Sequence, residues 1–160
     1  MKLSTKGRYA VMATIDLARH SRGRPVALAD IALRQGISLS YLEQLFAKLR
    51  RGGIVKSVRG PGGGYVLIHG ADGTRIADII LAVDEPIRAT RCKDGSPKGC
   101  TATGVRCVTH DLWEELSRQI HLFLSSVSIG DVLERRIVGT SQLAPAPANP
   151  LDRATAELTA

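Results

Sequence analysis

The stretch IVKSVRGPGGGYVLI, residues 54–68, decides the fold. Its two ends are rich in β-branched and aromatic side chains, which favour strands. Its centre, from Gly60 to Gly64, consists of glycine and proline only. Because glycine tolerates the backbone angles of a tight turn, the pattern predicts a two-stranded β-hairpin with a flexible tip.

Three helices are predicted before the hairpin, from the spacing of apolar residues and from their capping residues. They are a helix capped by Ser4 or Thr5 that ends around residues 20–23, a short helix over residues 28–33 that stops at Gly36, and a helix that begins at Ser38 or Ser40 and ends at residues 50–53. The third helix carries an apolar stripe made of Leu42, Leu45, Phe46 and Leu49. A glycine-containing turn therefore joins a short helix to an amphipathic one.

This order of helices is typical of a helix-turn-helix unit, whose second helix lies in the major groove of DNA. Helical bundles without a DNA role share the order, but the hairpin that follows reads as a wing. A nucleotide-binding phosphate loop is the alternative for the glycine run, which lacks the Lys-Ser or Lys-Thr pair that such a loop needs at the start of a helix. We therefore expect a mainly α fold with a small β wing, in which a winged helix-turn-helix domain precedes a long dimerisation helix.

Positive charge is concentrated in the N-terminal part of the chain. Residues 1–70 hold 12 Lys and Arg against 3 Asp and Glu, a balance of +9, whereas residues 71–160 hold 10 against 12, a balance of −2. This asymmetry favours a polyanionic partner, although a solvated surface also explains a charge run. The residues expected to contact double-stranded DNA from the third helix and the wing are Ser38, Ser40, Tyr41, Glu43, Gln44, Lys48, Lys56, Ser57, Arg59, Gly60, Pro61 and Gly62.

The cysteines lie together beyond the wing. After a helix that Thr74 can cap and that ends before Pro86, residues 88–108 are polar, hold several glycines and have no helical or strand period, so they predict a loop. This loop carries Cys92, Cys100 and Cys107, and His110 follows directly. An odd number of cysteines does not suit a disulfide framework, and three thiolates with one imidazole suit zinc or an iron–sulfur centre.

The spacing of these four residues bears on the choice between the two metals. Seven residues separate Cys92 from Cys100 and six separate Cys100 from Cys107, whereas structural zinc sites usually pair cysteines two residues apart. The wide spacing favours a larger cluster. Two other interpretations remain open: the thiols are simple redox-reactive cysteines, or His110 caps or pairs within its own helix.

A broad apolar stripe marks the helix predicted over residues 109–127, which is too apolar for a solvent spacer. Core packing explains part of the stripe, and pairing with a second copy presents two recognition helices to a palindrome. A short element over residues 129–134 is expected to pack on this helix. The Pro- and Ala-rich residues 140–160 predict a disordered tail.

Several protein classes do not fit the chain. No segment approaches the roughly 18 apolar residues that span a bilayer, and the N-terminus lacks the apolar core of a secretory signal, so we expect no membrane association and a cytoplasmic protein. The sequence holds no paired catalytic carboxylates and no nucleophile elbow. We therefore do not expect an enzyme.

Three segments carry a resemblance to a known family: residues 1–10, MKLSTKGRYA; residues 38–49, from Ser38 to Leu49; and residues 57–65, SVRGPGGGY. They resemble the bacterial winged-helix regulators of the IscR type. The resemblance implies a homodimeric transcription regulator, or repressor, that binds palindromic promoter DNA through the third helix and the wing and controls iron–sulfur assembly genes. It also implies a 2Fe-2S cluster held by three cysteines and a histidine, the latter in a Cys-x-x-His pair before Leu-Trp.

That pair reads Cys107 to His110 here, followed by Asp111, Leu112 and Trp113, so the resemblance assigns the ligands to Cys92, Cys100, Cys107 and His110. The alternatives are a nitric-oxide-sensing regulator of the same fold, a zinc-stabilised DNA-binding protein and a winged adaptor that binds proteins. The expected organisation is a winged helix-turn-helix domain over residues 1–84, a cluster-binding loop over 85–110, a dimerisation helix and short packing helix over 111–139, and the tail.

Overall fold

The structure is a computed structural model that describes residues 4–88, 100 and 104–137. Cys92 and the tail expected over residues 140–160 lie outside the described residues. The elements in chain order are α1 (Thr5–Ser21), α2 (Leu28–Gln35), α3 (Leu39–Arg51), β1 (Val55–Val58), β2 (Gly64–Leu67), α4 (Gly70–Gly73), α5 (Ile76–Ala82), α6 (His110–Ser126) and α7 (Ile129–Leu133). The fold predicted from the sequence, mainly α with a small two-stranded wing, is confirmed.

The first three helices begin and end close to the predicted residues. Ser4 caps α1 by accepting a hydrogen bond from the amide of Gly7, and Ser38 caps α3 by accepting one from the amide of Tyr41. Gly36 ends α2 at a φ of 62°, a left-handed conformation that glycine adopts without steric cost. Of the alternative capping residues, Ser4 and Ser38 are therefore the ones used.

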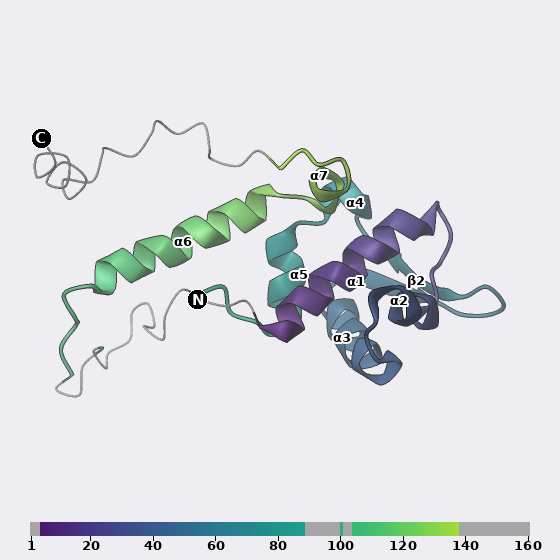
Figure 1. The fold of residues 1–160 in the computed structure, drawn as a ribbon, viewed down its shortest axis with the longest axis horizontal. Coiled ribbons are helices and arrows are strands. Elements are labelled where there is room, and N and C mark those ends of the chain that lie inside the picture. Colours follow the sequence, from purple (N-terminus) through teal and green to yellow (C-terminus); the bar gives the residue numbers. More distant parts are fainter. Residues whose placement is uncertain (1–3, 89–99, 101–103, 138–160) are drawn as a thin grey trace, which may run out of the picture.

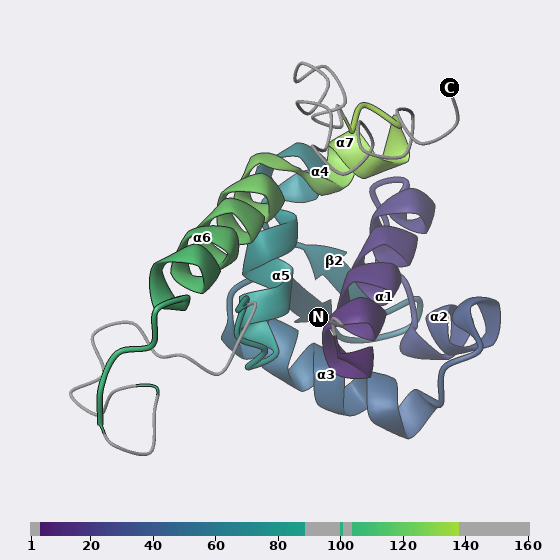
Figure 2. The same cartoon turned by 60° about the vertical axis from the view of Figure 1, so that its left-hand side comes forward.

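A single core lies under these helices. The apolar stripe predicted on α3 is fully buried, together with Leu17 of α1, Ile31 of α2 and Ile79 of α5. In Figure 2, α1 lies between α5 and α2, with α3 below it. Burial of the α3 stripe leaves the opposite side of this helix facing outward, and most of its polar side chains are exposed.

The wing is joined to the helical body through its second strand. Strands β1 and β2 pair antiparallel, from Val55 opposite Leu67 to Val58 opposite Gly64. The backbone of Tyr65 also exchanges two hydrogen bonds with Val26, of 3.0 and 2.9 Å, and its ring packs on Phe46 with centroids 4.9 Å apart. These contacts fix the base of the hairpin, whose tip reaches outward at the right of Figure 1.

The segment after the wing differs from the prediction in two ways. A four-residue helix, α4, precedes α5, and its sequence Gly-Ala-Asp-Gly gave no helical signal. Thr74 does not cap α5, because its hydroxyl donates a 2.7 Å hydrogen bond back to the carbonyl of Gly70, while Arg75 occupies the N-cap position. The predicted Thr74 cap is therefore wrong.

Helix α6 matches the long helix predicted from the apolar stripe, and it reaches away from the body. Its C-terminal end meets the body beside α5, whereas its N-terminal end lies far from α1 and α3 (Figure 1). Helix α7 makes its main contacts with α4 and α1, so the expectation that it packs on the preceding long helix is wrong. Backbone hydrogen bonds from Ile76 to Val127 and from Ile129 to Thr74, both 3.0 Å, direct the chain there.

Within the described residues, no helix combines the length and the apolar character that crossing a membrane requires.

Candidate metal centre and DNA interface

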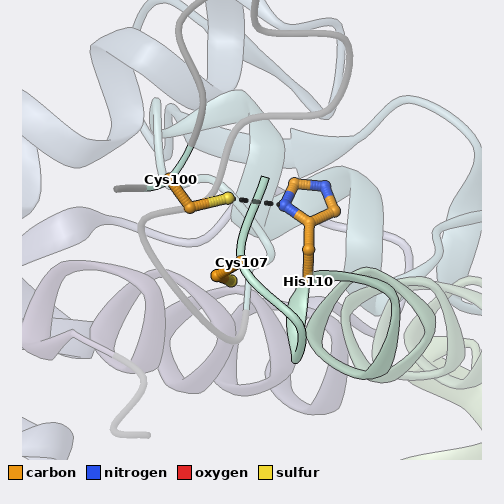
Figure 3. Close-up of side chains that lie close together, drawn as sticks. All are labelled: Cys100, Cys107 and His110. Carbon is orange, nitrogen blue, oxygen red and sulfur yellow. Dashed lines mark hydrogen bonds between the residues drawn. The ribbon is translucent and has the colours of Figure 1, made fainter. Parts of the chain in front are cut away.

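Two of the three cysteines and the predicted histidine lie together. The ligand atoms of Cys100, Cys107 and His110 all lie within 4.8 Å of one another. The sulfur of Cys100 points at the imidazole and lies 2.8 Å from Nδ1 (Figure 3). The fourth predicted ligand, Cys92, lies outside the described residues.

The start of α6 arranges this group. His110 is the first residue of α6, and its amide donates a 3.0 Å hydrogen bond to the carbonyl of Cys107. This turn brings two residues that are three positions apart onto the same side of the chain. Thr109, between them, has its hydroxyl 3.2 Å from the indole nitrogen of Trp113 and 3.7 Å from the sulfur of Cys107. The start of α6 thus positions two candidate metal ligands, the Cys107 thiol and the His110 imidazole.

The donor set suits a soft metal centre at the protein surface. The His110 ring is buried, Cys107 is half-buried and Cys100 is exposed. Thiolates and imidazole are ligands that zinc, iron–sulfur clusters and copper accept, and carboxylate-preferring ions such as magnesium do not fit. Exposure of one thiol leaves the group accessible to iron, sulfide or an oxidant.

The second nitrogen of the His110 ring has an acidic neighbour that the sequence analysis missed. Nε2 lies 3.5 Å from a carboxylate oxygen of Glu114, and the guanidinium of Arg106 lies 3.0 Å from that same oxygen. Arg106 also pairs with Asp111 at 2.6 Å. The spacing of four residues between His110 and Glu114 on one helix was a visible signal for this contact.

The residues predicted to contact DNA mostly face solvent. Ten of the twelve are exposed, on the outer side of α3 and around the wing, and the two that are half-buried have partners within the protein. Tyr41 packs edge-on against Tyr9, with ring centroids 6.1 Å apart. Lys48 donates a 2.8 Å hydrogen bond to Asp84, which lies just after α5. Hydrogen bonding by Lys48 holds the pKa of Asp84 below its usual range.

The basic side chains of the wing are available for an external partner. Among the residues that the structure describes, no carboxylate lies within 4.0 Å of the cationic groups of Lys56 or Arg59, and both side chains are exposed. A cation that forms no ion pair within the protein can pair with a DNA phosphate or enter a narrow minor groove without first breaking an internal contact. The geometry is therefore compatible with the predicted role of the wing.

Comparison with known proteins gives the family. Residues 3–135 match the Rrf2 family, described as iron-dependent transcriptional regulators. The chain is 54% identical over 134 residues to the HTH-type transcriptional regulator IscR of Vibrio campbellii, covering 84% of this chain and 78% of that protein. It is also 54% identical over 138 residues to the IscR of Photorhabdus laumondii, covering 86% of this chain and 82% of that one.

Solved structures agree with this assignment. The T. potens IscR superimposes with a TM-score of 0.67 at 38% identity, covering 91% of this chain and 94% of that chain. CymR, described as the global cysteine regulator of B. subtilis, gives 0.68 at 34% identity, covering 84% and 98%. The resemblance inferred from the sequence is confirmed, and so is the expectation of a regulator rather than an enzyme. The chain belongs to the Rrf2 family of iron-dependent transcriptional regulators and is similar throughout its winged-helix part to the IscR proteins.

Proposed function

We propose that the protein is a homodimeric, cytoplasmic regulator that holds a 2Fe-2S cluster and binds promoter DNA of iron–sulfur assembly genes. The observation that carries the proposal is the thiol–imidazole group at the first turn of α6, in a chain whose other half is a winged helix. Cys92, Cys100, Cys107 and His110 are the proposed ligands, and a bound cluster supplies a group whose presence depends on iron, sulfide and oxidants.

The donor chemistry supports this choice of cofactor. Two thiols and an imidazole within 4.8 Å of one another provide three of four ligands, and Cys92 on the same loop supplies the fourth. The wide spacing of the cysteines favours a cluster over a single zinc ion. The names of the IscR relatives and the iron-dependent family description point the same way.

The apolar face of α6 supports the homodimer. Leu112, Leu116 and Phe123 lie on one side of the helix, at spacings of four and seven residues, and their exposed fractions are 60%, 39% and 43%. Burial of such a stripe against the same stripe of a second copy removes it from water by a two-fold symmetric contact. The exposed fractions leave this face open to a partner, and α6 itself extends from the body (Figure 1).

Contacts within the protomer offer a route from the metal centre to the DNA-binding helix. Helix α6 packs on α5, and Asp84, two residues after the end of α5, pairs with Lys48 of α3. Lys6 of α1 lies 3.6 Å from Glu85 at the start of the proposed cluster-binding loop, residues 85–110. When the ligands are held together, this loop and the start of α6 form one unit. We propose that the ordering of this unit alters how α3 is presented to DNA.

DNA contacts are assigned in this proposal to the domain over residues 1–84. Helix α3 enters the major groove with Ser38, Ser40, Glu43 and Gln44, and the wing approaches the backbone and minor groove with Lys56 and Arg59. Lys48 takes part only if it leaves Asp84, since its ammonium is already paired.

The test compares the anaerobically reconstituted protein with its apo form on the same promoter fragments, by fluorescence anisotropy at fixed salt. The two forms should differ in affinity for at least one promoter, and that promoter should change the equilibrium affinity of the protein for its cluster by the same factor and in the same direction, because coupling between two binding sites is reciprocal. Arg59→Ala should weaken binding of both forms by about 1–3 kcal/mol if it reads a base or a narrow groove.

Arg59→Lys is the matched control, because it keeps the charge but loses the planar fork of donors. It should retain the salt dependence of binding and lose part of the affinity. Equal promoter affinities of the holo and apo forms across all fragments would contradict the proposed coupling.

A further inference from the structure

The imidazole of His110 lies between two different environments. Nδ1 faces the sulfur of Cys100 at 2.8 Å, and Nε2 faces the Glu114 carboxylate at 3.5 Å. The ring is 8% exposed, so water has little access to either nitrogen. A neutral imidazole carries one proton, and the nitrogen that carries it cannot be a ligand.

We propose that Glu114 is a positioning residue, which keeps the His110 proton on Nε2 and leaves the Nδ1 lone pair directed at the thiol group. At 3.5 Å the contact is longer than a hydrogen bond, but the carboxylate is negative and can only accept, so it favours the tautomer that carries the N–H on Nε2. The inference rests on the proposed function, since it assigns a purpose to Nδ1 as a metal ligand. A carboxylate behind a ligating histidine generally fixes both the tautomer and the orientation of the ring.

Arg106 makes the position of Glu114 specific. Alone, a glutamate that is 43% exposed on a helix surface samples several rotamers. The Arg106 guanidinium lies 3.0 Å from the same oxygen that faces Nε2, and 2.6 Å from the carboxylate of Asp111. Arg106 directly precedes Cys107. Its ion pairs therefore connect the segment that carries the proposed ligand Cys107 to helix α6, which carries the proposed ligand His110.

The identity of the neighbouring residue strengthens the assignment. Glu115, next along α6, pairs instead with Arg118 and accepts a hydrogen bond of 2.7 Å from Gln119. Its carboxylate is therefore engaged by residues further along α6, and within the described residues it forms no ion pair or hydrogen bond with the imidazole. Glu114 and Glu115 carry the same charge and lie next to each other in α6, but only Glu114 faces Nε2 of His110.

The experiment uses the full chain and the variants Glu114→Ala, Glu114→Gln and Glu115→Ala. In the apo protein, long-range ¹H–¹⁵N correlation spectra identify which nitrogen of the His110 ring carries the proton. Wild type and Glu115→Ala should hold the proton on Nε2. Glu114→Ala should populate the Nδ1-protonated form, and Glu114→Gln should restore the wild-type tautomer, because its amide oxygen still accepts.

The second readout is cluster retention after anaerobic reconstitution with ferrous iron and sulfide. Loss of a carboxylate behind a ligating histidine typically weakens metal binding about 10–100-fold. We expect Glu114→Ala to release iron to a chelator at least about 10-fold faster than wild type and to shift the reduction potential, with Glu114→Gln recovering most of the retention.

The inference is overturned if Glu114→Ala keeps the wild-type tautomer, or if Glu115→Ala changes retention as much as Glu114→Ala does. The tautomer measurement needs no cluster. Wild type that assembles no cluster while its Nε2 proton depends on Glu114 would therefore contradict the proposed function and not the placement of Glu114.

Discussion

At the scale of single residues, Asp16 is the charged group on which the helical body depends. Its carboxylate is almost completely buried between α1 and α2, where Arg34 donates hydrogen bonds of 3.0, 3.1 and 2.6 Å and Gln35 donates one of 2.7 Å. Burial by itself raises the pKa of Asp16, but the hydrogen bonds and the positive charges of Arg34 and His20 outweigh it and hold the pKa below its usual value. The ionised form is therefore the one that the fold stabilises.

This arrangement predicts how stability depends on pH. Because the pKa of Asp16 is lower in the folded than in the unfolded chain, its contribution is fully present above the unfolded value of about 3.9 and is lost as pH falls through the folded value. Asp16→Asn should lower the free energy of unfolding by about 1–3 kcal/mol at pH 7.

Urea titrations at pH 7 and at successively lower pH check this prediction, with exposed Asp78→Asn on α5 as the control. The difference between wild type and Asp16→Asn should shrink as the solution is acidified. A constant difference across the series would show that the charge of Asp16 is not what stabilises the fold.

At the scale of elements, the wing depends on a close approach of two backbones. A Cβ atom at Gly64 would lie 2.3 Å from the carbonyl oxygen of Val26, which itself accepts a 2.9 Å hydrogen bond from the amide of Tyr65. The atoms that an added Cβ would meet belong to the backbone of Val26 and Ala27, so no flexible side chain can move aside to make room for it. The last glycine of the tip is therefore required by packing and not only by the turn.

Gly64→Ala should accordingly detach the wing from the body and cost about 1–3 kcal/mol of stability. The measurement is hydrogen exchange of the Tyr65 amide together with thermal unfolding. Gly23→Ala is the control, because that position has a positive φ of 78° and open space around it, so it should lose stability without loss of Tyr65 protection. Unchanged protection in Gly64→Ala would contradict the role assigned to this contact.

Some elements of the fold could be predicted from local sequence signals, and others could not. Helices α1, α2 and α3 and the wing have strong local signals, namely the Ser4 and Ser38 caps, Gly36 and the glycine-rich tip, and they were predicted correctly. The packing of α7 depends on a hydrogen bond between segments distant in sequence, from Ile129 to Thr74, and no local pattern encodes it. Helix α4 consists of Gly-Ala-Asp-Gly, which carries no local helical signal. At the candidate metal centre, residue types and spacing indicated Cys100, Cys107 and His110, and the four-residue spacing of His110 and Glu114 was a signal for that contact. The Arg106 contact could not be predicted, because it depends on how the segment before α6 lies against the helix.

At the scale of the whole molecule, the protein consists of a body made of α1 to α5, α7 and the wing, and an arm made of α6 (Figure 1). The candidate metal centre lies at the N-terminal end of the arm, and the exposed apolar stripe follows the same helix. Two such arms packed together would place each metal centre near the dimer contact. Cofactor occupancy and assembly are therefore expected to influence each other.

Phe123→Lys should convert the proposed dimer into a monomer, because it places a charge within the apolar stripe. Sedimentation equilibrium of the apo protein without DNA should give about twice 17.1 kDa for wild type and 17.1 kDa for the variant. Leu33→Lys on α2 is the control, since Leu33 is also a large apolar residue and is 85% exposed. Dissociation by Leu33→Lys, or a dimer that survives Phe123→Lys, would place the contact elsewhere.

The most direct test of the account is iron and acid-labile sulfide analysis of the anaerobically reconstituted protein and its variants. The account predicts about two irons and two sulfides per protomer for wild type and for His121→Ala, a histidine on α6 that is not a proposed ligand. Cys100→Ala, Cys107→Ala and His110→Ala should each lose most of both. A normal cluster in Cys100→Ala, or wild type that binds zinc and holds no sulfide, would contradict it.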